Sequence, residues 1–204
     1  MDRRKFFKSG LDKVSRTAVK EIDARVKEQA TRWIRPPYAL DELEFLLACT
    51  RCDKCIEACP HQVIFSLPAR LGAQVAGTPA LDLLNKGCRL CEEWPCVMAC
   101  EPKALLFPAP SPLRPLPQLA SAAINTQSCL PYHGPECGAC AGSCPVPGAL
   151  IWDGARPRID PGKCIGCGLC RENCIVDPKA IDIRSLHRSD TVPSAAQADG
   201  NRTL

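Results

Sequence analysis

The sequence predicts an α+β protein that is rich in loops and is organised around its cysteines. Sixteen of the 204 residues are cysteine, and all of them fall into four short runs. The 20 prolines and an aromatic content of only 5% do not favour one large hydrophobic core. We therefore expect the fold to depend on what the cysteines bind, as in other small metal-dependent domains.

The first cysteine run has the spacing Cys-x2-Cys-x2-Cys-x3-Cys-Pro and consists of Cys49, Cys52, Cys55, Cys59 and Pro60. This is the bacterial ferredoxin spacing, in which three cysteines bind one 4Fe–4S cluster and the fourth binds a second cluster. A single run would leave its fourth cysteine without a cluster. The pattern therefore predicts that the run recurs in pairs.

The run does recur, with variations in its gaps. The second run has two extra residues between its second and third cysteines, and the third run has an enlarged gap between its first and second. The fourth run is regular but is followed by Ile175 instead of proline. These runs are Cys88, Cys91, Cys96 and Cys100; Cys129, Cys137, Cys140 and Cys144; and Cys164, Cys167, Cys170 and Cys174. No cysteine is left over, so the sequence predicts four 4Fe–4S clusters with all sixteen cysteines as ligands.

Two other uses of clustered cysteines fit the spacing less well. Disulfide frameworks are typical of small secreted domains, and cysteines with only two residues between them on a tight turn lack the usual separation of disulfide partners. Structural zinc commonly takes two Cys-x2-Cys pairs that lie a dozen or more residues apart, whereas each run here is compact. Clusters would also change the formal charge of +4, which counts every cysteine as a neutral thiol, to about −4.

The N-terminal segment, residues 1–37, is basic and is predicted to contain an amphipathic helix. Apolar residues recur at steps of three or four over residues 11–34, and the sequence Arg-Pro-Pro that follows would end a helix. Residues 1–35 carry 11 basic and 5 acidic side chains, a net charge of +6. Such a helix could lie on anionic lipid or dock on a partner, and packing on the protein itself is the alternative.

The positions of the runs divide the rest of the chain. Residues 38–108 hold the first two runs and are expected to form one two-cluster module, with a short helix over residues 40–48 at its start. Residues 109–124 form a proline-rich linker. Residues 125–186 hold the other two runs and form a second module, and residues 187–204 form a polar tail. The predicted fold is a tandem of bacterial-type ferredoxin-like modules with an N-terminal amphipathic helix.

The short connection between the third and fourth runs predicts how the runs pair. It has 19 residues, in which the stretches ALIW and PRID flank the turn DGAR and predict a hairpin. A hairpin of this length would return the chain so that the fourth cysteine of each run meets the other run. We therefore expect sequential pairing, first run with second and third with fourth. A nested arrangement, first run with fourth and second with third, is the alternative.

Under sequential pairing, each cluster takes three cysteines from one run and the fourth from its partner run. The four ligand sets are then Cys49, Cys52, Cys55 and Cys100; Cys88, Cys91, Cys96 and Cys59; Cys129, Cys137, Cys140 and Cys174; and Cys164, Cys167, Cys170 and Cys144. Sixteen cysteines satisfy four sites, so the nearby His61 and His133 are expected to have other roles.

Four stretches of the chain carry a family resemblance: RPPYALDELEFLLACTRCDKC, GTPALDLLNKGCRLCEEWPCVMACEPKAL, CLPYHGPECGACAGSCP and CIGCGLCRENCIVDPKAIDI. Over about 150 of its 204 residues the chain resembles the NapG/MauM ferredoxin-type proteins and the related NapF proteins. The unusual gaps of the second and third runs are the specific part of this resemblance. It implies a role in relaying electrons from a quinol-oxidising membrane partner toward a terminal reductase or an amine-oxidising system.

An electron-transfer protein with four clusters in series is the leading functional hypothesis. An enzyme is disfavoured, because the chain has no Gly-x-Gly-x-x-Gly motif, no P-loop, and no Cys-x3-Cys-x2-Cys motif that would leave a cluster iron open. The alternative is an assembly factor that helps a partner oxidoreductase to mature. Nucleic-acid binding is not expected, because the basic segment is one helix without interleaved aromatic residues.

The start of the chain bears on its location in the cell. The stretch DRRKFFK, with Arg3 and Arg4, resembles a twin-arginine export motif. Export also needs an apolar stretch and a cleavage site, but the residues that follow are rich in charge. The sequence therefore favours a cytoplasmic protein that could associate with a membrane, and periplasmic export through a degenerate signal is the alternative.

Overall fold

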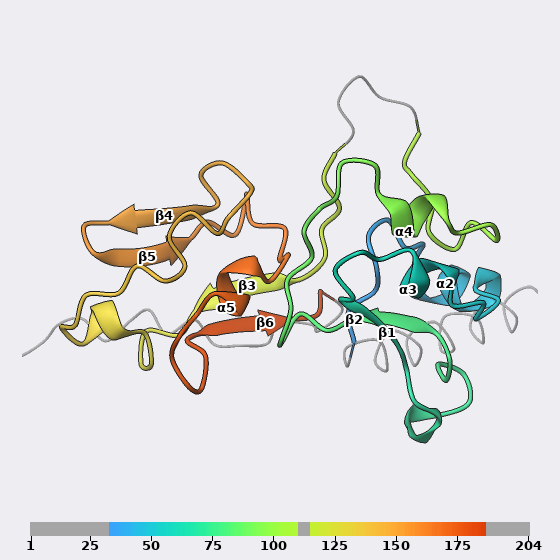
Figure 1. Ribbon diagram of the computed structural model, residues 1–204, viewed down its shortest axis with the longest axis horizontal. Coiled ribbons are helices and arrows are strands. Elements are labelled where there is room, and N and C mark those ends of the chain that lie inside the picture. The colour runs from blue at the N-terminus through green and yellow to red at the C-terminus, as the bar shows by residue number, and fades with distance from the viewer. Residues whose placement is uncertain (1–32, 110–114, 187–204) are drawn as a thin grey trace, which may run out of the picture.

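The structure is a computed structural model that describes residues 33–109 and 115–186. The predicted N-terminal helix lies almost entirely outside the described residues, as do part of the proline-rich stretch and the predicted polar tail. The described chain consists of short elements joined by long loops, as the composition predicts. Figure 1 shows two halves, one containing α2 to α4 with β1 and β2, and the other containing β3 to β6 with α5.

The first half is built on a small antiparallel hairpin and an outer pair of extended segments. Strands β1 (Ile64–Ser66) and β2 (Pro79–Leu81) pair with Ile64 opposite Leu81. The outer pair is a bridge between Ala39 and Leu105, which lie on either side of the first two cysteine runs. Its flanking backbone hydrogen bonds, at 3.0 and 2.9 Å, bring the chain before the first run next to the chain after the second.

The second half repeats this plan with longer strands. Its outer pair is β3 (Ser121–Ile124) with β6 (Ile181–Arg184), and its inner hairpin is β4 (Leu150–Asp153) with β5 (Arg156–Ile159). The hairpin between the third and fourth runs confirms the prediction. Its turn contains Gly154 at φ +58°, a left-handed conformation that suits glycine in a two-residue turn.

One stretch differs from the expected boundaries. Strand β3 begins at Ser121, inside residues 109–124, which were assigned to the linker. The preceding Leu119 and Ala120 are buried, and the backbone N–H of Leu119 donates to the carbonyl of Ile165 at 2.8 Å. The end of the proline-rich stretch is therefore part of the second half's packed structure.

The helices are short, and most of them belong to the cysteine runs. Helix α2 (Glu42–Ala48) lies where a helix is predicted and leads into the first run. Helices α3 (Lys54–Glu57), α4 (Pro95–Met98) and α5 (Leu169–Glu172) each contain the third cysteine of a run, and α3 packs against α4. Two 3₁₀ turns, η1 (Ala69–Leu71) and η2 (Leu130–Tyr132), complete the set. Within the described residues, none of the helices has both the length and the apolar character needed to cross a membrane.

One hydrophobic core runs through both halves. It joins Phe45 and Leu83 of the first half to Leu119, Ile165 and Leu169 of the second, and it includes cysteines of the first, second and fourth runs. These side chains are nearly inaccessible to water. The two halves are therefore packed together as well as linked by the chain.

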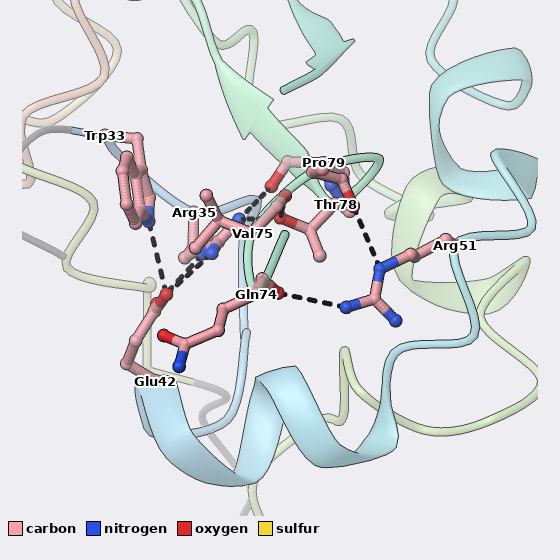
Figure 2. A network of polar contacts seen from close by, with 9 residues as sticks. Trp33, Arg35, Glu42, Arg51, Gln74, Val75, Thr78 and Pro79 are labelled. Carbon is pink, nitrogen blue, oxygen red and sulfur yellow. Dashed lines mark hydrogen bonds and ion pairs between the residues drawn. The ribbon is translucent and has the colours of Figure 1, made fainter. Parts of the chain in front are cut away.

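A buried polar network fixes the chain just before α2 (Figure 2). The guanidinium of Arg35 donates two hydrogen bonds to the carboxylate of Glu42, at 2.6 and 2.9 Å, and two more to the Thr78 hydroxyl and the Pro79 carbonyl. The indole N–H of Trp33 also donates to Glu42, at 3.2 Å. The side chains of Arg35 and Glu42 are only 7% and 1% exposed, so this ion pair is shielded from water.

Candidate iron–sulfur sites

The structure gathers the sixteen cysteines into four groups, each of which we call a site. A site is numbered by the run that supplies three of its cysteines. Site 1 contains Cys49, Cys52, Cys55 and Cys100; site 2 contains Cys88, Cys91, Cys96 and Cys59; site 3 contains Cys129, Cys137, Cys140 and Cys174; and site 4 contains Cys164, Cys167, Cys170 and Cys144. In each group, the fourth cysteine comes from the other run of the same half.

Sites 2, 3 and 4 each surround a cavity of similar size. The four cysteines of site 2 line a small cavity, together with Trp94 and His61. Those of site 3 line another, with Ile124 and Ile181, and those of site 4 line a third, with Ile165. The remaining lining side chains are mostly apolar, so each cavity combines four sulfur donors with walls that exclude water.

Site 1 is the most open of the four. Cys52 is exposed, whereas Cys55, within α3, is buried. Burial, and after it the neighbouring thiols of Cys100, Cys49 and Cys52, raises the pKa of Cys55 to about 12. Cys100 also lies close enough to Cys49 to raise its pKa. The last cysteine of the second run is therefore at this site.

Burial raises the thiol pKa values at all four sites. The pKa reaches about 12 at Cys96 and Cys170, and about 11 at Cys88 and Cys140, with desolvation the largest cause and the other cysteines of the site adding to it. Such thiols are neutral at pH 7 unless a cation compensates the charge of the thiolate. A positively charged iron–sulfur core would do so, because metal coordination deprotonates thiols outright.

A recurring left-handed residue shapes the start of three runs. Arg51, Leu90 and Gly166 stand two positions after the first cysteine of the first, second and fourth runs, at φ of +58°, +52° and +70°. In each case the backbone N–H of that residue donates to the sulfur of the first cysteine, and this hydrogen bond lowers the pKa of the thiol against the effect of burial. The loop thus points an N–H group at the ligand atom.

A second left-handed residue precedes each short helix. Asp53, Trp94 and Gly168 stand two positions before the third cysteine and are the N-terminal caps of α3, α4 and α5, at φ of +58°, +48° and +80°. In the second run, the extra residues Glu92 and Glu93 lie before Trp94. Despite the insertion, the second run therefore enters its helix by the same turn as the first and fourth runs, and its third cysteine has the same position in the helix.

The insertion of the third run folds back on the inner hairpin. It contains η2, whose Tyr132 hydroxyl donates to the carbonyl of Pro157 in β5 at 2.9 Å. The guanidinium of Arg156 lies 5.5 Å from the centre of the Tyr132 ring. His133 forms a 3.0 Å hydrogen bond with the carbonyl of Thr126, a role other than cluster binding. The third run has no α-helix among its described residues, which distinguishes it from the others.

One glycine is required by the packing around site 4. A Cβ atom on Gly166 would lie 2.0 Å from the carbonyl oxygen of Ala120, and its φ of +70° also disfavours a side chain. The N–H of Gly166 donates to the sulfur of Cys164 at 3.4 Å. Because residue 166 has no side chain, the segment that leads into β3 can cover this loop, and the N–H of Gly166 faces the sulfur of Cys164.

Comparison with known proteins places these features in a family. A family model described as a 4Fe-4S dicluster domain matches residues 117–175, a range that holds every cysteine of the third and fourth runs. The methylamine utilization ferredoxin-type protein MauM of Methylobacillus flagellatus is 33% identical over 159 residues, which are 74% of this chain and 67% of that protein. The ferredoxin-type protein NapF of Escherichia coli is 34% identical over 164 residues, 78% of this chain and 89% of that protein.

This chain is a member of the MauM, NapG and NapF ferredoxin-type family. The ferredoxin-type protein NapG of Haemophilus influenzae is 30% identical to it over 163 residues, 74% of this chain and 58% of that protein. No solved structure matches the chain. The chain is thus a ferredoxin-type iron–sulfur protein with a loop-rich fold of small sheets and few helices.

The residues of this ferredoxin-type chain fit 4Fe–4S clusters. Every site offers four thiols, which suits iron–sulfur clusters. Among residues 33–109 and 115–186, no three His, Cys, Asp or Glu side chains converge closely enough for a single metal ion. The cysteines instead surround cavities, and backbone N–H groups of Leu105 and Ala180 point at the sulfurs of Cys100 and Cys174, at 3.3 and 3.4 Å.

Sequence analysis missed the residues that hold the sites in place. Arg35 was interpreted only as part of a helix stop, and Glu42 as an ordinary helix residue, yet they form the buried ion pair of the first half. The contacts between the halves were missed as well. The one available signal was an arginine next to two prolines and seven residues before a glutamate, and this spacing alone does not indicate burial.

Proposed function

We propose that the chain binds four 4Fe–4S clusters and carries electrons between redox proteins. The observation that supports this most directly is the arrangement of sixteen cysteines in four quartets, each with three members from one run and one from its partner run. When bound, 4Fe–4S clusters supply one-electron transfer at potentials set by their surroundings. Every cysteine of the chain is used by this assignment.

We propose the ligand sets of sequential pairing, which are the four sites as defined above. The position of Cys174 supports this choice, because it lines the same cavity as Cys129, Cys137 and Cys140. The nested alternative would require Cys174 to meet the first run. That run instead lies with Cys100, which influences both Cys49 and Cys55.

The chain's own residues would do three things for bound clusters. The N–H groups of Arg51, Leu90 and Gly166 donate to sulfur and so stabilise the thiolate form. Trp94, only 6% exposed, lies against site 2 and keeps water away from it. Both hydrogen bonding and burial are known to tune the reduction potential of iron–sulfur centres.

We propose that the partners are a quinol-oxidising membrane protein as donor and a terminal reductase or amine-oxidising system as acceptor. The names of the relatives support a redox setting, since MauM is a methylamine utilization protein. We also propose a cytoplasmic location with membrane association through the basic N-terminal segment. Fractionation of cells that express the full chain tests this, and recovery in the periplasm would contradict it.

The first experiment is anaerobic purification followed by analysis of iron, acid-labile sulfide and zinc. We expect about 16 iron and 16 sulfide per chain, because each of the four clusters contributes four of each. Reduced-state EPR should show interacting spectra of neighbouring clusters. Zinc in place of iron, or iron for only two sites, would contradict the proposal.

A second measurement separates a carrier from an assembly factor. A carrier, once reduced, should be reoxidised by a mature terminal oxidoreductase at the rate of turnover. An assembly factor should bind the precursor of that enzyme and be dispensable in assays with the mature form. Slow reoxidation together with precursor binding would replace the carrier function by the assembly function.

A further inference from the structure

The two halves meet along a seam between the second and fourth cysteine runs. The backbone N–H of Cys88 donates to the carbonyl of Cys167 at 2.7 Å. The backbone N–H of Gly87 donates to one carboxylate oxygen of Glu172 at 3.0 Å, and Arg89 forms an ion pair with the other, also at 3.0 Å. The loop that begins site 2 is therefore bonded on both sides of Cys88 to the segment that forms site 4.

Glycine allows the two backbones to approach this closely. A Cβ atom on Gly87 would lie 2.6 Å from the Leu169 side chain and 2.8 Å from its backbone Cα. Real Cβ atoms do not come so near to other heavy atoms, so any side chain at position 87 would push α5 away. On the opposite side of the seam, a Cβ on Gly168 would lie 3.2 Å from the Leu83 carbonyl oxygen.

The seam sets the order of the sites in space. Helix α3, which holds Cys55 of site 1, packs against α4, which holds Cys96 of site 2. Cys88 of site 2 is in turn hydrogen-bonded to Cys167 of site 4. Cys140 of site 3 packs in one cluster of buried residues with Cys170 of site 4. Site 2 thus adjoins sites 1 and 4, and site 4 adjoins sites 2 and 3.

We propose that the four sites form one unbranched row in the order 1, 2, 4, 3, and that Gly87 and Glu172 are the positioning residues that hold sites 2 and 4 together. This inference rests on the proposed function, because the row matters only if the sites hold clusters. Its consequence is that the order in space differs from the order along the chain. Sites 1 and 3 are the two ends at which an electron can enter or leave, and sites 2 and 4 lie inside.

The test compares two glycine substitutions in the full-length, cluster-loaded protein. Gly87→Ala inserts a methyl group into the seam, whereas Gly138→Ala adds the same group in the third run, where nothing lies within 4 Å of it. Both proteins are analysed for iron and sulfide. Pulsed EPR of the reduced state then measures the magnetic interaction between clusters, which falls steeply with their separation.

We expect Gly87→Ala to keep about 16 iron per chain but to lose the interaction between the halves, so that its spectrum becomes the sum of two separate two-cluster systems. Gly138→Ala should match the unsubstituted protein. Two results would overturn the row. One is a Gly87→Ala protein that holds all its iron and keeps the magnetic interactions between clusters unchanged; the other is a Gly138→Ala protein that loses these interactions to the same extent. If Gly87→Ala fails to load, Glu172→Ala replaces it, since it removes only the side-chain acceptor and the ion pair.

The same data distinguish the two proposals. Iron for fewer than four clusters in the unsubstituted protein would refute the proposed function. Full iron with an unperturbed Glu172→Ala spectrum would refute the seam alone. A partial loss of coupling in Glu172→Ala at full iron content would support the positioning role, because a contact that serves stability only would not change the separation of clusters.

Discussion

Replacing Arg35 by methionine should destabilise the first half strongly. Methionine keeps most of the apolar stem but removes the guanidinium, which donates four hydrogen bonds in the buried network. Among the described residues, the carboxylate of Glu42, at 1% exposure, would then keep only the 3.2 Å hydrogen bond from Trp33. Removing one partner of a buried ion pair costs about 3–5 kcal/mol, because the other charge is left buried and uncompensated.

The destabilisation is measured as an increase in the rate of unfolding, because iron–sulfur proteins lose their clusters when they unfold and do not refold reversibly. Anaerobic unfolding in urea is followed by visible absorbance of the clusters and by circular dichroism. If the network is broken in the transition state for unfolding, a loss of about 3–5 kcal/mol accelerates unfolding by roughly two to four powers of ten. A network that partly survives in the transition state gives a smaller acceleration.

Two further variants decide whether the buried charge is the cause. Arg35→Met combined with Glu42→Leu removes both charges and should recover most of the lost stability, since apolar replacement of a buried pair is often neutral. Lys54→Met removes an exposed partner of Glu101 and should leave the rate unchanged. Unfolding of Arg35→Met at the original rate, or a double variant no slower than the single one, would refute the reasoning.

Four other predictions follow from the sites. Cys174→Ser should remove the cluster of site 3 and leave about 12 iron per chain; loss at the site of Cys49 would instead show nested pairing. Gly166→Ala should reduce cluster loading at site 4, because the new Cβ would lie 2.0 Å from a carbonyl oxygen; iron analysis and EPR check this, and full loading would contradict it. Removal of iron by a chelator should unfold most of the chain, as circular dichroism would show. Whatever folded iron-free protein remains should lose stability as the pH rises from 9 toward 12, because buried thiols such as Cys55 and Cys96 have a pKa of about 12 when folded and 9.0 when not. A stability that is constant over this range would count against burial as the cause.

The sequence predicted local features well, because these depend on residues close together in the chain. The helix before the first run and the hairpin between the third and fourth runs are confirmed. The sequence shows the enlarged gaps of the second and third runs, but not how the fold accommodates them. That depends on the left-handed Trp94 before α4 and on the packing of Tyr132 against β5.

Features that join distant residues could not be predicted. Gly87 and Glu172 are 85 positions apart, and nothing in a glycine or an exposed-looking glutamate indicates such a contact. The start of β3 was hidden by the prolines before it, which made the whole stretch look extended and unpacked. In both cases tertiary packing, rather than local propensity, determines the structure.

The exchange of the fourth cysteine within each half bears on how the protein is made. Both quartets of the first half are complete once the ribosome has released Cys100, because none of their members comes from later in the chain. The second half is complete only after Cys174, and the seam partner of Gly87 is made almost as late. If the proposed sites hold clusters, the first two can therefore be loaded on the nascent chain before α5, which lies across the seam, has been made.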